Sequence, residues 1–155
     1  MRTLDQTPTL IILMGLQASG KTTFFERYLM DRGCVHINLD TLKTRNRETL
    51  EVTRCQESRL SYVIDNTNPT KEDRRRYIGP AKNQGYHIVG YFMQSKLGSC
   101  LERNNRRERQ VPKKGILATF NKIEIPSLEE GFDELNFVWI EDGEFKISKW
   151  IEDEI

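Results

Sequence analysis

The sequence lacks a long hydrophobic run and the cysteine patterns of disulfide-rich or zinc-binding proteins. Its longest apolar run, Leu10 to Met14, is far too short to span a bilayer, so no membrane partner is expected. The three cysteines, Cys34, Cys55 and Cys100, are odd in number and show no CxxC spacing, which argues against a disulfide framework or a zinc site. A basic segment followed by a secretory apolar stretch is also missing, and we therefore expect a cytoplasmic protein.

Length and charge limit the organisation of the chain. At 155 residues it has room for one domain, which we place at residues 1–155. The net charge of +1 hides an asymmetry, since residues 1–125 carry 22 basic and 13 acidic side chains whereas residues 126–155 carry 2 and 10. A basic body favours polyanions such as nucleotides or nucleic acid, although solvated charge spread over all faces would give the same counts.

Strand and helix patterns alternate along the first two thirds of the chain. Residues 10–14 form a buried-strand pattern, residues 21–33 have apolar side chains at helical spacing, and residues 34–40 alternate as a strand that ends at Asp40. The alternation continues with a helix at 41–59, a strand at 61–64, a helix at 69–84 and a strand at 87–93. This order predicts an α/β fold with a mostly parallel sheet, helices on both faces, and ligands beyond the carboxyl ends of the strands.

The last third of the sequence has a different character. It begins with a basic helix at 97–109 and a second helix at 112–122, which together suggest a lid over residues 97–125. The acidic segment 126–155 then predicts a strand and a small hairpin that turns at Asp142 and Gly143.

A phosphate-binding motif lies between the first predicted strand and helix. Gly15, Gly20, Lys21 and Thr22 match G-x-x-x-x-G-K-[ST] without a mismatch. The glycines let backbone amides surround an anion, Lys21 would reach the β and γ phosphates, and Thr22 would coordinate Mg²⁺. The motif predicts a three-layer α/β/α P-loop NTPase fold that binds a nucleoside triphosphate. The predicted nucleotide contacts in the loop are Gly15, Ala18, Ser19, Gly20, Lys21, Thr22 and Thr23.

Two classes of P-loop protein fit poorly. A guanine switch needs N-K-x-D after a strand, whereas the nearest match, residues 121–124, reads NKIE after a predicted helix, and D-x-x-G is missing from the sequence. A motor ATPase would carry an acidic pair after the third strand, but Asp65 is followed by Asn66. A small P-loop chain without these features favours transfer of the terminal phosphoryl group of ATP to an acceptor.

Phosphoryl transfer to a hydroxyl requires a base at the acceptor and positive charge around the moving group. Asp40, at the end of the second predicted strand, could be that base, although an Asp before a helix could equally be its N-cap. Four arginines crowd the end of the basic helix and could form a closing lid or a solvated helix face. They are Arg103, Arg106, Arg107 and Arg109.

Taken together, these motifs resemble those of the 5′-kinase domain of the bifunctional polynucleotide kinase/phosphatase repair enzymes. The likeness covers most of the chain and rests on GLQASGKTTF, VHINLDTLK, VIDNTNPTKEDRRRYI, LERNNRRERQVP and PSLEEGFDEL, in the family's order. It implies that Asp40 activates the acceptor hydroxyl, and that Lys43 contacts an acceptor phosphate where some members use Arg. It also implies that Arg103 and Arg107 cover the ATP phosphates, with Arg106 as the alternative.

The resemblance gives Asp65 and Asn66 a place in the acceptor and metal site. Asp65 would hold Mg²⁺ through a water or hold the acceptor loop, with residues 66–68 shaping the site, whereas the residues alone also allow an Asx turn before Pro69. Two departures are present: no D-x-D pair occurs, so the phosphatase half is not expected here, and Leu39 stands where polynucleotide enzymes tend to have Arg.

The leading hypothesis is a Mg²⁺- and ATP-dependent kinase of a DNA or RNA 5′-hydroxyl. A kinase of a small metabolite or nucleotide sugar is the alternative, and a nucleotide-dependent switch or binding module without an acceptor is a second one. Residues 74–76 could add phosphate contacts or form a solvated basic face. We expect His36 and His87 to serve packing or to lie at the surface.

Overall fold

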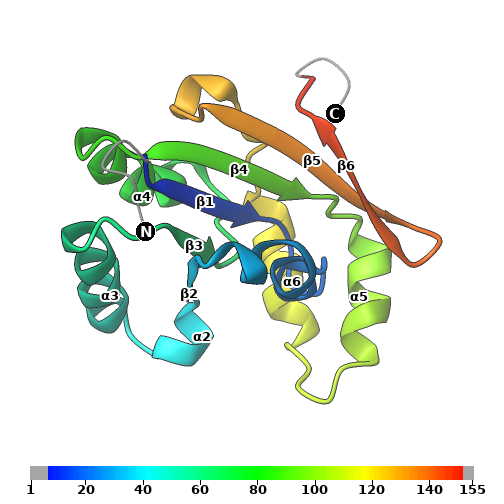
Figure 1. The fold of residues 1–155 in the computed structure, drawn as a ribbon. Helices are drawn as coiled ribbons and strands as arrows, with labels where there is room; N and C mark the ends of the chain where they lie inside the picture. Colours follow the sequence, from blue (N-terminus) through cyan, green and yellow to red (C-terminus); the bar gives the residue numbers. More distant parts are fainter. Residues whose placement is uncertain (1–6, 152–155) are drawn as a thin grey trace.

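The fold is built around a six-stranded sheet, which the computed structural model describes within residues 7–151 (Figure 1). The strands are β1 (Thr9–Met14), β2 (Val35–Ile37), β3 (Tyr62–Asp65), β4 (His87–Met93), β5 (Glu134–Glu141) and β6 (Glu144–Lys149). They lie in the order β2-β3-β1-β4-β5-β6, and all neighbours run parallel except β5 and β6. The predicted α/β fold with a mostly parallel central sheet is confirmed.

Helices cover both faces of this sheet because its central strand is apolar on both sides. The helical segments are α1 (Lys21–Phe24), η1 (Phe25–Leu29), η2 (Met30–Arg32), α2 (Leu39–Leu42), α3 (Arg45–Glu57), α4 (Lys71–Asn83), α5 (Leu97–Asn105), α6 (Lys113–Lys122) and η3 (Leu128–Glu130). Ile12 of β1 packs in the core that includes residues of α3 and α4, whereas Leu13 packs with Phe24 and Phe25 of the segment after the glycine loop. Within residues 7–151 no helix has the length and apolar character needed to cross a bilayer.

The second predicted strand is shorter than expected, and this moves a predicted catalytic residue. The strand stops at Ile37 because the side chain of Asn38 accepts hydrogen bonds from the amides of Asp40 and Thr41 and starts α2. Asp40 therefore lies in the first turn of a short helix, and the prediction that it closes the strand is wrong. The alternative that Asp40 caps this helix is also wrong, since Asn38 is the cap.

Two predicted helices end or break earlier than their sequence patterns indicate. The helix expected at 41–59 is interrupted at Lys43, which has a φ of 76°, and α3 then begins after the Thr44 cap. The basic helix expected at 97–109 stops at Asn105, so residues 106–110 form a loop. Asn104 closes this loop, since its amide donates to Val111 O at 2.7 Å and its Oδ1 accepts from Val111 N at 2.9 Å.

The C-terminal hairpin is confirmed. Strands β5 and β6 pair in antiparallel register up to Glu141 opposite Glu144. The turn consists of Asp142 and Gly143, which have φ values of 51° and 76°, as a tight two-residue turn requires.

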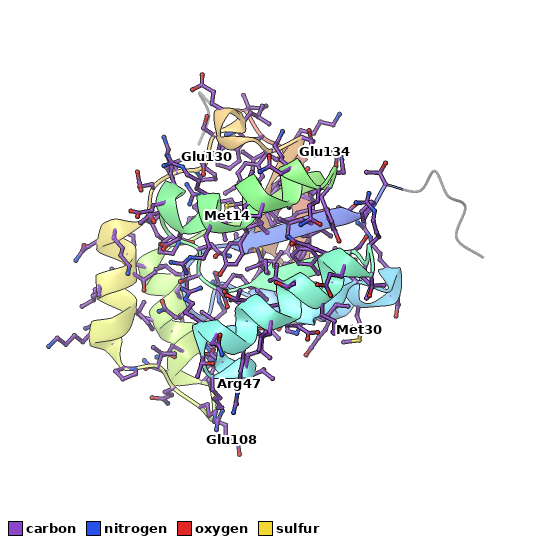
Figure 2. The ribbon with its side chains drawn as sticks, turned by 90° about the vertical axis from the view of Figure 1, so that its left-hand side faces the viewer. Met14, Met30, Arg47, Glu108, Glu130 and Glu134 are labelled. Atoms are coloured by element: carbon purple, nitrogen blue, oxygen red, sulfur yellow. The ribbon has the colours of Figure 1, made fainter. Side chains whose placement is uncertain are left out.

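One arginine of the run at 74–76 is a structural residue. Arg74 is fully buried and forms a two-pronged ion pair with Glu130, with N···O distances of 2.7 and 3.1 Å. Figure 2 shows Glu130 beside α4, and the third Arg74 bond goes to Asn68 O at 3.0 Å. Asn68 in turn donates to Leu13 O at 2.7 Å. The interpretation of Arg74 as a phosphate contact is therefore wrong: it anchors the loop after β3 to the end of β1.

We predict that Arg74→Met destabilises the fold by about 3 to 5 kcal/mol, because it leaves the largely buried Glu130 carboxylate without its partner. Arg75→Met, an exposed neighbour on the same helix, is the matched control and should change stability little. Urea unfolding followed by circular dichroism measures both. Equal midpoints for the two variants would contradict the structural role of Arg74.

Candidate active site

The loop that follows β1 turns at two glycines in conformations that L side chains rarely adopt. Gly15 has a φ of 143° and Gly20 a φ of 101°. A Cβ on Gly15 would lie 3.0 Å from Ser19 Oγ, and one on Gly20 would lie 3.2 Å from the ring of Phe145. The loop leads directly into the helical segment that begins at Lys21, which is the arrangement that presents backbone amides to bound phosphates.

The ammonium group of Lys21 is held inside this loop by backbone carbonyls. Its Nζ donates to Gly15 O at 2.9 Å and to Leu16 O at 2.7 Å. Burial lowers the pKa of Lys21 to about 8, against the opposing effect of the nearby Asp65 carboxylate. An anionic ligand at the loop would favour the charged lysine, so the site combines a desolvated cation with a cavity that suits phosphate.

Thr22 and Asp65 meet although they lie 43 positions apart. Thr22 Oγ1 donates to Asp65 Oδ2 at 2.9 Å, and Asp65 is only 2% exposed. A hydroxyl and a carboxylate are the hard oxygen ligands that Mg²⁺ prefers, and Mg²⁺ commonly completes its coordination with substrate phosphates and water. The pair fits the predicted metal role. The described residues include no group of three or more His, Cys, Asp or Glu side chains that could hold a metal unaided.

His36 belongs to the same cluster, which the sequence analysis missed. Its Nε2 lies 2.7 Å from Asp65 Oδ2, and its ring stacks on Phe25 at a centroid distance of 4.1 Å. The Asp65 carboxylate thus contacts Thr22 and His36, in place of the backbone amide that an Asx turn would require. The strand alternation contained a signal, because it places His36 on the opposite face from Val35 and Ile37, which is the face covered by the helical segment after the glycine loop.

A single cavity of about 630 Å³ collects most of the predicted site residues. The predicted residues in its wall are Ala18, Gly20, Lys21, Thr22, Thr23, Asp40, Asp65, Asn66, Arg103 and Arg107. Gly15 and Ser19 lie in the glycine loop outside this wall, and Ser19 borders a smaller cavity beside it. Lys43 is exposed and also outside the wall, whereas Leu39 is part of it.

Asp40 reaches the cavity because α2 is fastened to the end of β3. Asn38 Nδ2 donates to Asp65 O at 2.8 Å, and Leu39 N donates to Asn66 Oδ1 at 3.0 Å. The exposed carboxylate of Asp40 can therefore reach a ligand in the cavity. The helix placement corrects the local structure that was predicted, but the residue still lies in the cavity wall.

Three arginines from α5 and the loop after it also line the cavity. Arg103 on α5 donates from Nε to Ala18 O at 2.7 Å, and Arg107 lies in the loop after that helix. Arg106 caps the helix and pairs with Glu102 at 2.6 Å. All three line the cavity, whereas Arg109 does not. The helix α5 and the loop after it therefore bring three cations to the cavity, and contact of Arg107 or the alternative Arg106 with ATP phosphates stays a prediction.

Comparison with known proteins agrees with this geometry. The family model described as AAA domain matches residues 10–54, the stretch from β1 through the glycine loop and into α3. The chain carries the glycine loop of P-loop proteins, and its fold is shared by a gluconokinase and an APS kinase. The structure of a gluconokinase from Sinorhizobium meliloti superposes on this P-loop protein with a TM-score of 0.61 at 19% identity, covering 86% of this chain and 83% of that one.

Curated relatives extend the likeness over most of the P-loop protein. A bifunctional polynucleotide phosphatase/kinase of Schizosaccharomyces pombe is 28% identical over 151 residues, which is 92% of this chain and 37% of that protein. An L-seryl-tRNA(Sec) kinase of Methanococcus maripaludis is 26% identical over 142 residues, which is 80% of this chain and 56% of that protein. The chain is thus distantly homologous to polynucleotide phosphatase/kinases and spans about a third of the length of the fission yeast protein.

We predict that Lys21→Ala weakens ATP binding about 100-fold or more, because the loop then loses the cation nearest to the β and γ phosphates. Lys114→Ala, on the exposed face of α6, is the matched control and should bind as the unmodified protein does. Isothermal titration with Mg²⁺ and ATP gives both dissociation constants. Undiminished affinity in Lys21→Ala would contradict the assignment of the loop.

Proposed function

We propose that this P-loop protein is an ATP-dependent kinase that transfers the γ-phosphoryl group to a hydroxyl, with a polynucleotide 5′-hydroxyl as the acceptor. The observation that supports it is the shared cavity. Asp40 lies in the same 630 Å³ space as Lys21 and the lid arginines, so an alcohol and a triphosphate could meet there.

The residues of the cavity divide into acceptor and donor roles. Asp40 would accept the proton of the attacking hydroxyl while that oxygen bonds to the γ-phosphorus, and the bond from the γ-phosphorus to the leaving oxygen of ADP breaks. Lys21 and Arg107 would stabilise the charge on the transferred group, and Arg103 would hold the ATP phosphates. Thr22 and Asp65 are the residues that would hold Mg²⁺, which neutralises phosphate charge when bound.

Two features support a polynucleotide as the acceptor. The fission yeast relative carries that activity in its name, and its likeness covers 92% of this chain. Exposed basic residues also occur on both sides of the cavity, with Lys43 and Arg47 after α2 and Arg107 and Arg109 in the lid loop. Figure 2 shows that Arg47 on α3 and Glu108 in the loop after α5 lie toward the same end of the molecule. Phosphates flanking a 5′ end could bind such side chains.

One observation favours a small acceptor instead. Leu39 in the cavity wall cannot bind a phosphate, and gluconokinase is among the proteins that share this fold. Ionic strength separates the two acceptors, because binding of a polyanion weakens steeply with added salt whereas binding of an uncharged metabolite does not.

The direct test is transfer of labelled γ-phosphate from ATP to a 5′-hydroxyl oligonucleotide of DNA or RNA. Asp40→Asn should lower the rate by about 100-fold or more and leave ATP affinity unchanged, since the side chain keeps its size but loses its basicity. Asp31→Asn, exposed at the end of the helical segment after the glycine loop, is the control.

Three outcomes distinguish the hypotheses. Transfer to an oligonucleotide that depends on Asp40 supports the proposal. Phosphorylation of sugars or nucleosides, but of no oligonucleotide, would move the acceptor to the small-molecule class. Slow ATP hydrolysis without any phosphorylated product would leave a nucleotide-dependent binding module.

A further inference from the structure

A buried carboxylate lies close to the acceptor side of the cavity without belonging to it. Glu48 on α3 is 2% exposed, and it is not part of the cavity wall. Its Oε1 accepts from Tyr77 Oη at 2.8 Å and from Arg45 Nη1 at 3.1 Å. Its Oε2 accepts from Asn66 Nδ2 at 3.0 Å. Burying a carboxylate costs free energy unless several donors bond to it, and these three partners offset that cost.

The contact with Asn66 has a directional consequence. An ionised carboxylate can only accept hydrogen bonds, so it requires the amide nitrogen of Asn66 to point toward it. Tyr77 Oη also receives a bond from this nitrogen, at 3.3 Å. The oxygen of the same amide must then point away, and it accepts from Leu39 N at 3.0 Å. Glu48 thereby sets which end of Asn66 meets α2.

The bond to Leu39 N matters because α2 is too short to be stable alone. It has four residues, and helices of one turn do not persist in water without outside contacts. Leu42 near its end packs against the core and Lys43 then breaks it with a positive φ, so the hydrogen bonds at its start fix the end that carries Asp40. These are the Asn38 cap and the amide of Asn66, and Asp40 is the next residue after Leu39.

Tyr77 completes the support of Glu48. Burial, together with the Glu48 carboxylate beside it, raises the pKa of Tyr77, so its hydroxyl keeps its proton and donates to Glu48. Arg45 Nη1 donates to the same hydroxyl at 2.8 Å. The four side chains therefore connect α3, α4 and the loop after β3 through bonds whose directions agree.

We propose that Glu48 is a positioning residue for phosphoryl transfer: by orienting Asn66, it fixes the one-turn helix that holds Asp40 in the cavity. This inference rests on the proposed function, in which Asp40 is the base at the acceptor hydroxyl. Glu48 touches neither substrate, so its effect should appear in the transfer step and not in ATP binding.

The main variant is Glu48→Gln, which keeps the shape but can present either an oxygen or a nitrogen to Asn66. We expect kcat for transfer to a 5′-hydroxyl oligonucleotide to fall about 10- to 100-fold through misplacement of the base. The dissociation constant for ATP should change by less than about two-fold. Glu51→Gln is the matched control, because Glu51 lies on the same helix and also pairs with an arginine three residues away.

A double-mutant comparison separates positioning from a general loss of stability. In an Asp40→Asn background, Glu48→Gln should lower kcat no further, since no base remains to be placed, whereas any loss of stability would be the same in both backgrounds. Combining Glu48→Gln with Asn66→Asp should restore part of kcat. The new carboxylate can accept from Leu39 N and from the introduced amide.

A readout independent of the reaction is the backbone amide of Leu39 in ¹H–¹⁵N NMR spectra. Glu48→Gln should shift this resonance and speed its exchange with solvent, and Glu51→Gln should not. If Glu48→Gln fails to fold, Tyr77→Phe is the second variant: it removes one donor to Glu48 and keeps the ring, and it should produce the same changes in smaller measure.

Three results would overturn the proposal: unchanged kcat in Glu48→Gln, an equal fall of kcat in the Asp40→Asn background, or an unperturbed Leu39 amide. Absence of transfer by the unmodified protein to any acceptor would instead refute the proposed function, and the Leu39 amide would then decide the positioning role by itself.

Discussion

The site depends on the hydrogen bonds that join the loop after β3 to the end of β1. Gly15 N donates to Thr67 O at 3.0 Å, and Asn68 donates to Leu13 O at 2.7 Å. These bonds hold two neighbouring parallel strands so that the glycine loop follows one and the acidic, amide-rich loop follows the other. Arg74 supports this junction from α4 through its bond to Asn68 O. Thr22, Asp65, Asp40 and the glycine loop are all placed relative to this junction.

The side of the cavity that carries Asp40 is assembled by amide side chains rather than by regular structure. Asn38 starts α2 and ties it to Asp65 O, and Asn66 ties the first amide of that helix to the loop after β3. On the side of the glycine loop, Lys21 is held by loop carbonyls and Arg103 by Ala18 O. The cavity therefore lies between the glycine loop and Asp40, whose helix is tied to the loop after β3 by long-range hydrogen bonds.

The sequence was sufficient where local chemistry decides the structure. The glycine loop, the succession of β1 to β4 along the chain and the turn at Asp142 follow from spacing, alternation and turn residues, and most of the predicted site residues line one cavity. It was insufficient where distant residues decide. The Asn38 cap that ends β2 is held in place by Asp65, 27 positions away, and the alternating pattern conceals it because it continues through that point. The burial of Arg74 depends on Glu130, so three adjacent arginines look alike in the sequence.

The central claim is geometric: Asp40 faces the γ-phosphorus of ATP across a gap that admits an alcohol. The most direct measurement is a crystal structure of the protein with Mg²⁺ and a non-hydrolysable ATP analogue. The account predicts the γ-phosphate between Lys21 and the lid arginines, with the Asp40 carboxylate directed at it and space for a hydroxyl between them. A carboxylate that turns to solvent, or protein atoms that fill the intervening space, would contradict the account.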